Sequence, residues 1–341
     1  MTIEGLPLLL TGLAAVLATA VAVAVLWDRA GRITRAALVA ACVLSLAATV
    51  ALQLNRLTET YTSWAALAGE RDPAVPPGPG PVAAPSGPGG RVVRLAVAGR
   101  ASGMTMPAYV YLPPGYQRGH QRYPVIEALH GFPGSPKSWL RRLDVRRHLD
   151  QEIAAGRMAP ALVVFPYQTP DPMVDTECTD LAGGPRAETF LTVDVPAAVR
   201  ASYRVRTGRG AWGLIGYSAG GFCAADLLLR HPGQYAAAAS LSGYASPGIR
   251  VGDGSERTTN NVGWRLRHLP QPPAGLYLGY TADDPHSRRD SSLMAGLATA
   301  PLAVTTGVVA HGGHSDAAWE LMEPAAFDWL SSWLARPAEA P

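Results

Sequence analysis

The chain has 341 residues, of which 48% are hydrophobic and 16% are charged, and its formal net charge is +3. A soluble domain usually has about 25% charged residues, so the composition argues against a disordered chain or a coiled coil. The basic residues form no dense run, which argues against nucleic-acid binding, and three cysteines are too few for a disulfide scaffold or a four-cysteine zinc site.

Two stretches near the N-terminus contain no charged residue, one at 6–27 and the other at 36–54. Each reaches the roughly 20 residues that a helix needs to cross a membrane, so we expect two transmembrane helices. The connection between them carries Arg29, Arg32 and Arg35. Because cytoplasmic loops are enriched in arginine and lysine, this pattern predicts a plasma-membrane protein with its N-terminus and everything after the second helix outside the cytoplasm.

Two alternatives remain for these stretches: a signal sequence cleaved near Ala51, and two buried core helices. The following segment, 57–90, is polar at first and then rich in proline and glycine, which favours an extended linker. The sequence therefore predicts a membrane hairpin at 1–56, this linker, and a globular domain at 91–341.

The globular part alternates short apolar runs with helical patterns. This alternation predicts an α/β fold with a mostly parallel sheet covered by helices on both faces, and places functional loops at the carboxyl ends of the strands. The expected strands are 91–100, 104–112, 123–129, 161–167, 213–216, 235–241, 275–281 and 302–310, and the expected helices are 139–156, 218–230 and a last one ending near residue 334.

The segment Gly216-Tyr-Ser-Ala-Gly220 is the only G-x-S-x-G pattern in the chain. A predicted strand runs into it and a predicted helix runs out of it, which is the setting of a nucleophile elbow. Small residues are needed there because the turn is strained and lies close to the sheet. We therefore expect Ser218 to be a nucleophile, with the N–H of Ala219 available for an oxyanion.

A serine hydroxyl needs a base and an acid, which follow the serine in the order acid, then histidine, in an α/β-hydrolase. His314 lies between the last expected strand and the last helix, and we prefer it as the base over His311. Asp284 follows the preceding strand and is the first choice for the acid. Asp283 is the second choice and Asp290 is a distant third.

A second oxyanion donor is expected in the loop after the third strand. There the N–H of Phe132 is the candidate, because the next residue, Pro133, has no N–H. We expect Trp139 and Trp319 to lie near the substrate together with Phe132. The sequence has no nucleotide-binding loop or metal-ligand cluster, so we expect neither a cofactor nor a metal.

Two cysteines, Cys178 and Cys223, lie in the part expected outside the membrane, and Cys42 lies in the second apolar stretch. In an oxidising compartment a Cys178–Cys223 disulfide would hold the loop 168–187 against the helix that follows Ser218.

Several segments besides the G-x-S-x-G pattern have a recognisable form: Glu188–Thr192, Val195-Pro196, the segment up to Tyr203-Arg-Val, His231–Tyr235 and Leu241–Tyr244. With them, the sequence from about residue 91 to 334 resembles the esterase D and antigen 85 branch of the α/β-hydrolases, which includes carboxylesterases, S-formylglutathione hydrolases and mycolyltransferases. The resemblance implies Ser218 as nucleophile, His314 as base, and Phe132 and Ala219 as oxyanion donors.

Two positions depart from the mycolyltransferase pattern. His130 stands where those enzymes carry an aspartate, and the acid candidates are aspartates directly after the strand instead of a more distant glutamate. These departures argue against transfer to trehalose and leave hydrolysis and another acyl transfer open.

The leading hypothesis is a membrane-anchored serine esterase that acts on a small-molecule, lipid or glycolipid ester outside the cytoplasm. One alternative is an acyltransferase that moves an acyl group to a sugar or lipid alcohol of the cell envelope. The other is an inactive envelope-binding domain that keeps the fold.

Overall fold

The structure is a computed structural model that describes residues 6–58, 64–67, 80–81 and 89–339. The chain divides into two compact units, Met1–Ala74 and Val75–Pro341. Most of the expected linker 57–90 lies outside the described residues. Within it the structure describes, besides its two ends, a short helix α3 (Trp64–Leu67) and a strand β1 (Gly80–Pro81).

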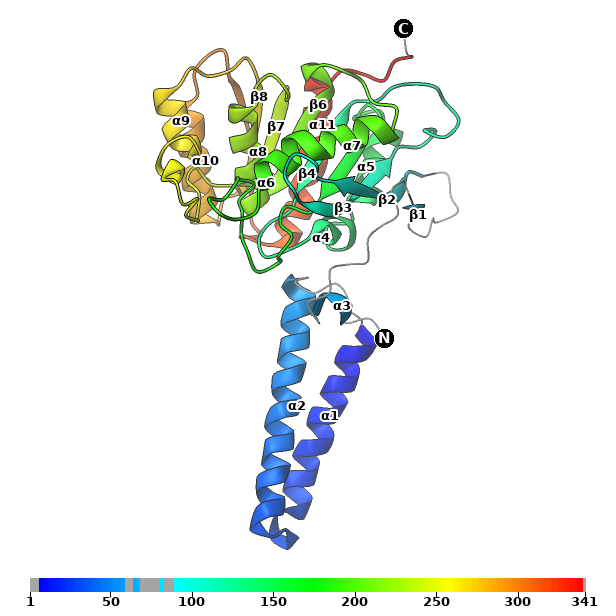
Figure 1. The fold of residues 1–341 in the computed structure, drawn as a ribbon, viewed down its shortest axis with the longest axis vertical. Coiled ribbons are helices and arrows are strands. Elements are labelled where there is room, and N and C mark those ends of the chain that lie inside the picture. Colours follow the sequence, from blue (N-terminus) through cyan, green and yellow to red (C-terminus); the bar gives the residue numbers. More distant parts are fainter. Residues whose placement is uncertain (1–5, 59–63, 68–79, 82–88, 340–341) are drawn as a thin grey trace. The chain divides into compact units, whose positions relative to one another are not determined.

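The first unit contains a pair of helices, α1 (Leu6–Leu26) and α2 (Arg32–Thr58), joined by a 3₁₀ turn at Trp27–Arg29 (Figure 1). Both are long and apolar enough to cross a membrane. They pack through small residues: a Cβ on Gly12 would lie 2.7 Å from Thr49 Oγ1, and the hydroxyls of Thr19 and Ser45 are 3.1 Å apart. Such close contacts are typical of helices that associate in lipid.

The second helix is longer than the 36–54 predicted from the sequence, because it takes in two of the arginines. The N–H of Arg35 donates to Gly31 O, and its side-chain Nε donates to Ala30 O at 2.9 Å. Its guanidinium also lies 5.2 Å from the centre of the Trp27 ring. Since arginine is a good helix former, charge alone does not end the helix, and the connecting turn is shorter than expected.

The second unit is built on a nine-stranded sheet with the order β1-β2-β3-β5-β4-β6-β7-β8-β9 (Figure 1). In this order, the neighbouring strands from β1 to β5 pair antiparallel. The neighbouring strands from β5 through β4 to β9 pair parallel. This confirms the mostly parallel sheet. The strands are β2 (Arg91–Ala98), β3 (Thr105–Leu112), β4 (Val125–Leu129), β5 (Leu162–Pro166), β6 (Trp212–Tyr217), β7 (Ala237–Leu241), β8 (Gly275–Thr281) and β9 (Ala303–Val309).

Helices cover both faces of this sheet, as the alternating pattern predicted. The helices are α4 (Pro136–Arg141), α5 (Val145–Ala154), α6 (Ala187–Thr189), α7 (Val195–Ser202), α8 (Ala219–Arg230), α9 (Val262–His268), α10 (Pro285–Leu297) and α11 (Asp316–Trp333), with 3₁₀ turns at Arg209–Ala211 and Ser255–Arg257 and a π-helical turn at Phe190–Asp194.

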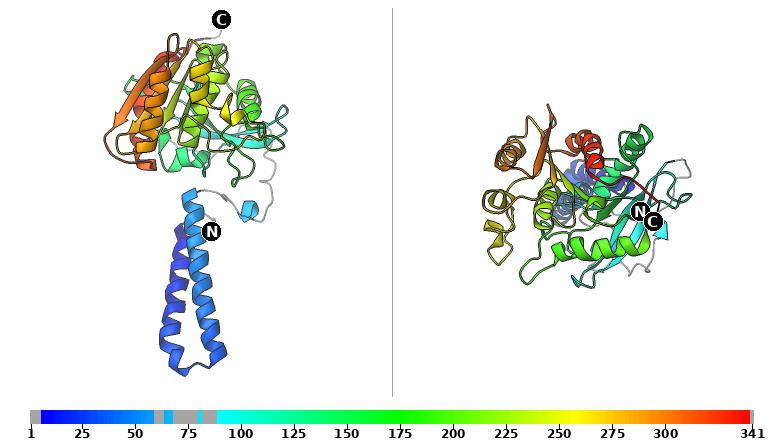
Figure 2. Two further views of the ribbon diagram at one scale, coloured as in Figure 1. Left: turned by 90° about the vertical axis from the view of Figure 1, so that its left-hand side faces the viewer. Right: turned by 90° about the horizontal axis from the view of Figure 1, so that it is seen from above.

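Alternate residues of the central strands enter two separate cores, because side chains point to opposite faces along a strand. In β6, Leu214 packs with the core that includes residues of α7 to α10, and the next residue, Ile215, packs with the core that includes residues of α4, α5 and α11. Figure 2 shows α8 and α11 on opposite faces of the sheet. The central strands are therefore buried on both sides, and the carboxyl ends of the parallel strands meet at one edge.

The predicted helix 139–156 is two helices in the structure, α4 and α5. The chain breaks at Asp144, whose φ of 46° lies in the left-handed region that an α-helix cannot continue through. Ser135 caps the first helix by accepting a hydrogen bond from the N–H of Lys137.

Candidate active site

Ser218 lies in the sharp turn between β6 and α8, with φ 55° and ψ −122°. Two glycines permit this turn by their lack of a side chain. A Cβ on Gly216 would lie 1.9 Å from Gly220 O, and a Cβ on Gly220 would lie 2.2 Å from Leu129 O at the end of β4. The start of α8 thus packs directly against two strand ends, and the positive φ of Ser218 is the strain that such an elbow stores.

Three of the predicted side chains lie in line at the carboxyl edge of the sheet. His314 Nε2 is 2.9 Å from Ser218 Oγ, and His314 Nδ1 is 2.9 Å from Asp284 Oδ2. Ser218, His314 and Asp284 come from the turns after β6, β9 and β8, respectively. The parallel sheet thus brings His314 next to residues that are 96 and 30 positions away in the sequence. With Nδ1 protonated and donating to Asp284, Nε2 is free to accept the serine proton.

Asp284 is the first-choice acid and is almost fully buried. Burial raises its pKa, but hydrogen bonds from Ser287 and His314 outweigh this effect and hold the pKa below its usual value. Ser287 Oγ donates to Asp284 Oδ2 at 2.5 Å, and the backbone N–H groups of His286 and Ser287 donate to Oδ1. Asp284 also caps α10, and the carboxylate is therefore fixed in place and ionised.

The second-choice acid, Asp283, binds the backbone of the loop that carries His314. Its carboxylate accepts hydrogen bonds from the backbone N–H groups of Gly313 at 2.9 Å and Gly312 at 3.2 Å. These bonds lower the pKa of Asp283 to about 2. Asp283 thus holds the loop that carries His314, while the imidazole itself is hydrogen-bonded to Asp284.

The remaining alternatives lie outside the line of three. His311 is 88% exposed and its Nδ1 is 3.7 Å from Asp283. Asp290 accepts a hydrogen bond from the N–H of Ala245 on another loop. In the part of the chain that the structure describes, no hydrogen bond or ion pair joins either residue to Ser218.

A cleft of about 280 Å³ opens beside Ser218. Phe132 lies on its rim, 37% exposed, and Trp319 stands edge-on to the His314 ring with centroids 5.0 Å apart. The cleft also has a charged side, where Arg142 Nη1 is 3.2 Å from Asp316 Oδ2. The lining residues are Gly131, Phe132, Pro133, Ser138, Arg142, Tyr217, Ser218, His314, Ser315, Asp316 and Trp319.

The two expected oxyanion donors belong to segments that lie next to Ser218. Ala219 is the first residue of α8, and the first N–H groups of a helix have no partner within it. Phe132 lies in the loop after β4, whose Gly131 packs against the serine: a Cβ on Gly131 would lie 3.2 Å from Ser218 Cβ. Both residues therefore lie in segments that adjoin Ser218, and their role as oxyanion donors stays a prediction.

Trp139 does not line the cleft, contrary to the expectation from the sequence. Its side chain is completely buried in the core, where its ring packs against Tyr217 at 5.1 Å and against Phe165 and Phe327 at 6.4 Å. The face of α4 that carries Trp139 packs on the sheet, and Tyr217 separates this ring from Trp319.

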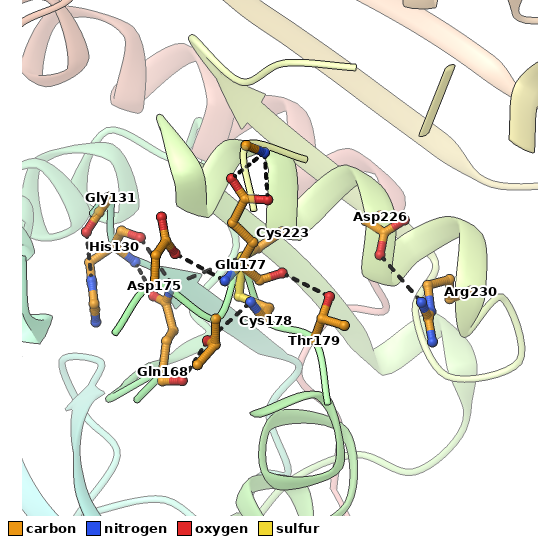
Figure 3. Close-up of a disulfide and its surroundings, with 12 residues drawn as sticks. His130, Gly131, Gln168, Asp175, Glu177, Cys178, Thr179, Cys223, Asp226 and Arg230 are labelled. Carbon is orange, nitrogen blue, oxygen red and sulfur yellow. Dashed lines mark hydrogen bonds and ion pairs between the residues drawn. A yellow bond between two sulfur atoms is a disulfide. The ribbon is translucent and has the colours of Figure 1, made fainter. Parts of the chain in front are cut away.

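A disulfide joins Cys178 to Cys223 in the structure, with Cα atoms 5.6 Å apart (Figure 3). Cys223 lies on α8, five residues after Ser218, and Cys178 lies on the loop between β5 and α6. The bond attaches this loop to the elbow helix, as the expected pairing required. Cys42, in α2, is a free thiol.

Sequence reasoning missed several residues around this site. Ser287, which donates to Asp284, could have been found because Asp-Pro-His-Ser is a typical helix start, with an N-cap followed by proline. The ion pair between Arg142 and Asp316 joins residues 174 positions apart and has no local signal. Among residues 6–58, 64–67, 80–81 and 89–339, no group of three His, Cys, Asp or Glu side chains could hold a metal ion.

Comparison with known proteins gives the family of the chain. The Esterase family, described as putative esterase, matches residues 100–335, well over half of the chain. An uncharacterized protein of Corynebacterium glutamicum is 25% identical over 265 residues, which are 71% of this chain and 62% of that protein. The chain thus spans less than two thirds of that relative.

Solved structures give the same fold at low sequence identity. A ferulic acid esterase has a TM-score of 0.65 and 18% identity, covering 73% of this chain and 100% of that one. An S-formylglutathione hydrolase from Agrobacterium tumefaciens has a TM-score of 0.63, 14% identity, and covers 75% and 100%. The fluorophosphonate-binding serine hydrolase F of Staphylococcus aureus has a TM-score of 0.58, 17% identity, and covers 72% and 99%. The chain belongs to the esterase family and has the α/β-hydrolase fold.

The different contacts of the two aspartates predict different effects of removing their charges. We expect Asp284→Asn to lower kcat by about 10⁴-fold, because the amide disfavours the required tautomer of His314. Asp283→Asn should cost about tenfold or less, because only the anchoring of the loop is weakened. Steady-state kinetics on an activated ester measure both effects, and equal losses in the two variants would contradict the assignment.

The hydrogen bonds of Asp283 also predict that its contribution to the stability of the fold changes with pH. Because the folded-state pKa of Asp283 is depressed to about 2, its stabilising contribution is present above the ordinary pKa, near 4. It is lost as pH falls through about 2. Asp283→Asn should therefore lower the melting temperature at pH 7 and have progressively less effect towards pH 2, as measured by thermal unfolding.

Proposed function

We propose that this member of the esterase family is a membrane-anchored serine esterase that hydrolyses a carboxylic ester outside the cytoplasm. The observation that carries the proposal is the unbroken line from Ser218 Oγ through the His314 imidazole to Asp284, with both contacts at 2.9 Å. Ser218 and His314 both line the cleft. A nucleophile, a base and an acid arranged in this way suit acyl transfer through a covalent intermediate.

In the proposed mechanism, Ser218 Oγ attacks the ester carbonyl carbon while His314 Nε2 takes the hydroxyl proton. Asp284 stabilises the resulting imidazolium through Nδ1–H. The N–H groups of Phe132 and Ala219 donate to the carbonyl oxygen as it becomes negative, which is the largest electrostatic contribution in such reactions. His314 then gives its proton to the departing alcohol, and the acyl group remains on Ser218.

Water completes the proposed cycle. It enters beside the acyl-enzyme, gives a proton to His314 and attacks the acyl carbon, and the carboxylic acid leaves as Ser218 recovers its proton. His314 is accessible to water, since 43% of its side chain is exposed. The open cleft therefore favours hydrolysis, although an alcohol that bound there would take the acyl group by the same steps.

The proposed anchor is the helix pair α1 and α2, and the proposed orientation follows from the arginines of its turn. Arg29, Arg32 and Arg35 lie in or beside the connection between the helices. By the positive-inside bias this end faces the cytoplasm, which puts the globular unit on the other side. An oxidising compartment there agrees with the Cys178–Cys223 disulfide.

We expect Ser218→Ala to lower the rate of hydrolysis of p-nitrophenyl acetate by at least about 10⁴-fold, because the nucleophile is removed. With wild-type protein the free acid should remain the main acyl product when sugars or glycerol are added. Chromatography of the products measures this partition. A main product that is an ester of the added alcohol would favour the acyltransferase, and a wild-type chain without turnover would favour the inactive binding domain.

The anchor and its orientation have a separate test. In intact bacterial spheroplasts that produce the full chain, we expect added protease to digest the globular unit, while the turn at 27–31 stays protected. The mature protein should also retain its N-terminus, as read by mass spectrometry. Protection of the globular unit would contradict the orientation, and loss of the first 50 or so residues would indicate a cleaved signal sequence.

A further inference from the structure

The loop that carries Phe132 is held by a side chain that the proposed mechanism does not use. Gln168 is buried just after β5, the strand next to β4. Its Oε1 accepts a hydrogen bond from the backbone N–H of His130 at 2.6 Å, and its Nε2 donates to the backbone C=O of His130 at 3.1 Å. One amide thus fixes both backbone polar groups of the residue two positions before Phe132 (Figure 3).

Two further contacts limit the movement of His130. Its Nδ1 is 2.8 Å from Gly131 O, and burial lowers its pKa to about 4, so the neutral ring keeps a proton on Nδ1 for this bond near pH 7. The start of α8 lies on the other side, where a Cβ on Gly220 would be 2.6 Å from His130 O. His130 therefore lies between the Gln168 amide and the elbow, and its ring orders the following peptide.

Gln168 itself is tied to the helix that follows Ser218. Its backbone C=O accepts a hydrogen bond from Thr176 Oγ1 at 3.0 Å, and the same hydroxyl oxygen accepts one from the N–H of Cys178. The disulfide then joins Cys178 to Cys223 on α8, and Gln168 Nε2 lies 3.9 Å from Cys223 Sγ. The residues that hold the Phe132 loop are thus linked to α8, the helix that begins directly after Ser218.

We infer that Gln168 is a positioning residue that fixes the direction of the Phe132 N–H relative to Ser218. The inference rests on the proposed function, in which this N–H stabilises the oxyanion. Such a donor is effective only when its direction is set before the reaction, and removing one donor outright typically costs about 10²–10³-fold in kcat. The lost interaction is one made in the transition state, so the effect belongs in kcat and not in KM.

Gln168→Met tests this inference, because methionine has a similar length and shape and makes neither hydrogen bond. We expect kcat for p-nitrophenyl acetate to fall by about 10- to 100-fold, with KM changed by less than about twofold. The affinity for an alkyl boronic acid, whose oxygen occupies the oxyanion position once the boron binds Ser218, should fall in parallel. If Gln168→Met does not fold, Gln168→Glu keeps an acceptor for His130 N–H while removing the donor to His130 O, and the same kcat loss is expected.

Gln271 is the matched control, since it also holds backbone with both ends of its amide. Its Nε2 donates to Leu266 O at 2.9 Å and to Leu297 O at 2.8 Å, and its Oε1 accepts from the N–H of Thr299 at 2.7 Å. It precedes the amino end of β8, opposite the edge where Ser218 lies. Gln271→Met should lower the melting temperature as Gln168→Met does and leave kcat unchanged.

The outcomes separate this inference from the function on which it rests. An active wild-type chain whose Gln168→Met variant keeps kcat and boronate affinity, or loses only in KM, overturns the positioning role alone. A wild-type chain that neither turns over the ester nor binds the boronate overturns the proposed function and this inference with it. All measurements use the full chain in mild detergent, with the folded fraction taken from near-ultraviolet circular dichroism.

Discussion

The start of helix α8 lies so close to the ends of strands β4 and β6 that no side chain fits between them. This contact places Ser218 in its positive-φ conformation at the carboxyl edge of the sheet, and it requires glycine at 216 and 220. Strain of this kind persists only where the surrounding structure holds it. Here Ser218 N donates to Leu241 O at the end of β7, and the cores on both faces bury the strands that lead into the turn.

The rest of the site follows from which strands end near this contact. The loops after β4, β5, β8 and β9 all open at the same edge and carry the Phe132 peptide, Gln168, Asp284 and His314. Each loop is held by its own hydrogen bonds: the capping contacts of Asp284, the glycine N–H groups that bind Asp283, and the amide of Gln168. The catalytic geometry we propose is thus a property of the sheet edge, with local anchors that set each loop.

Much of the fold and of the line of three residues could be predicted because their signals are local in sequence. Apolar runs alternating with helical patterns gave the parallel sheet, and the G-x-S-x-G pattern between a strand and a helix located Ser218. Contacts between distant backbone groups had no such signal. Asp283 and Gln168 bind the N–H or C=O groups of residues about 30 to 40 positions away, and such groups are present at almost every position. Trp139 was placed wrongly because the residue type alone does not tell which face of its helix packs on the sheet.

Ser218, held in this elbow, is the nucleophile that we propose. The most direct measurement is treatment of the full chain with a fluorophosphonate, followed by digestion and mass spectrometry of the labelled peptide. We expect one adduct, on Ser218, and none on the Ser218→Ala variant. An adduct on another serine, or equal labelling of that variant, would contradict it.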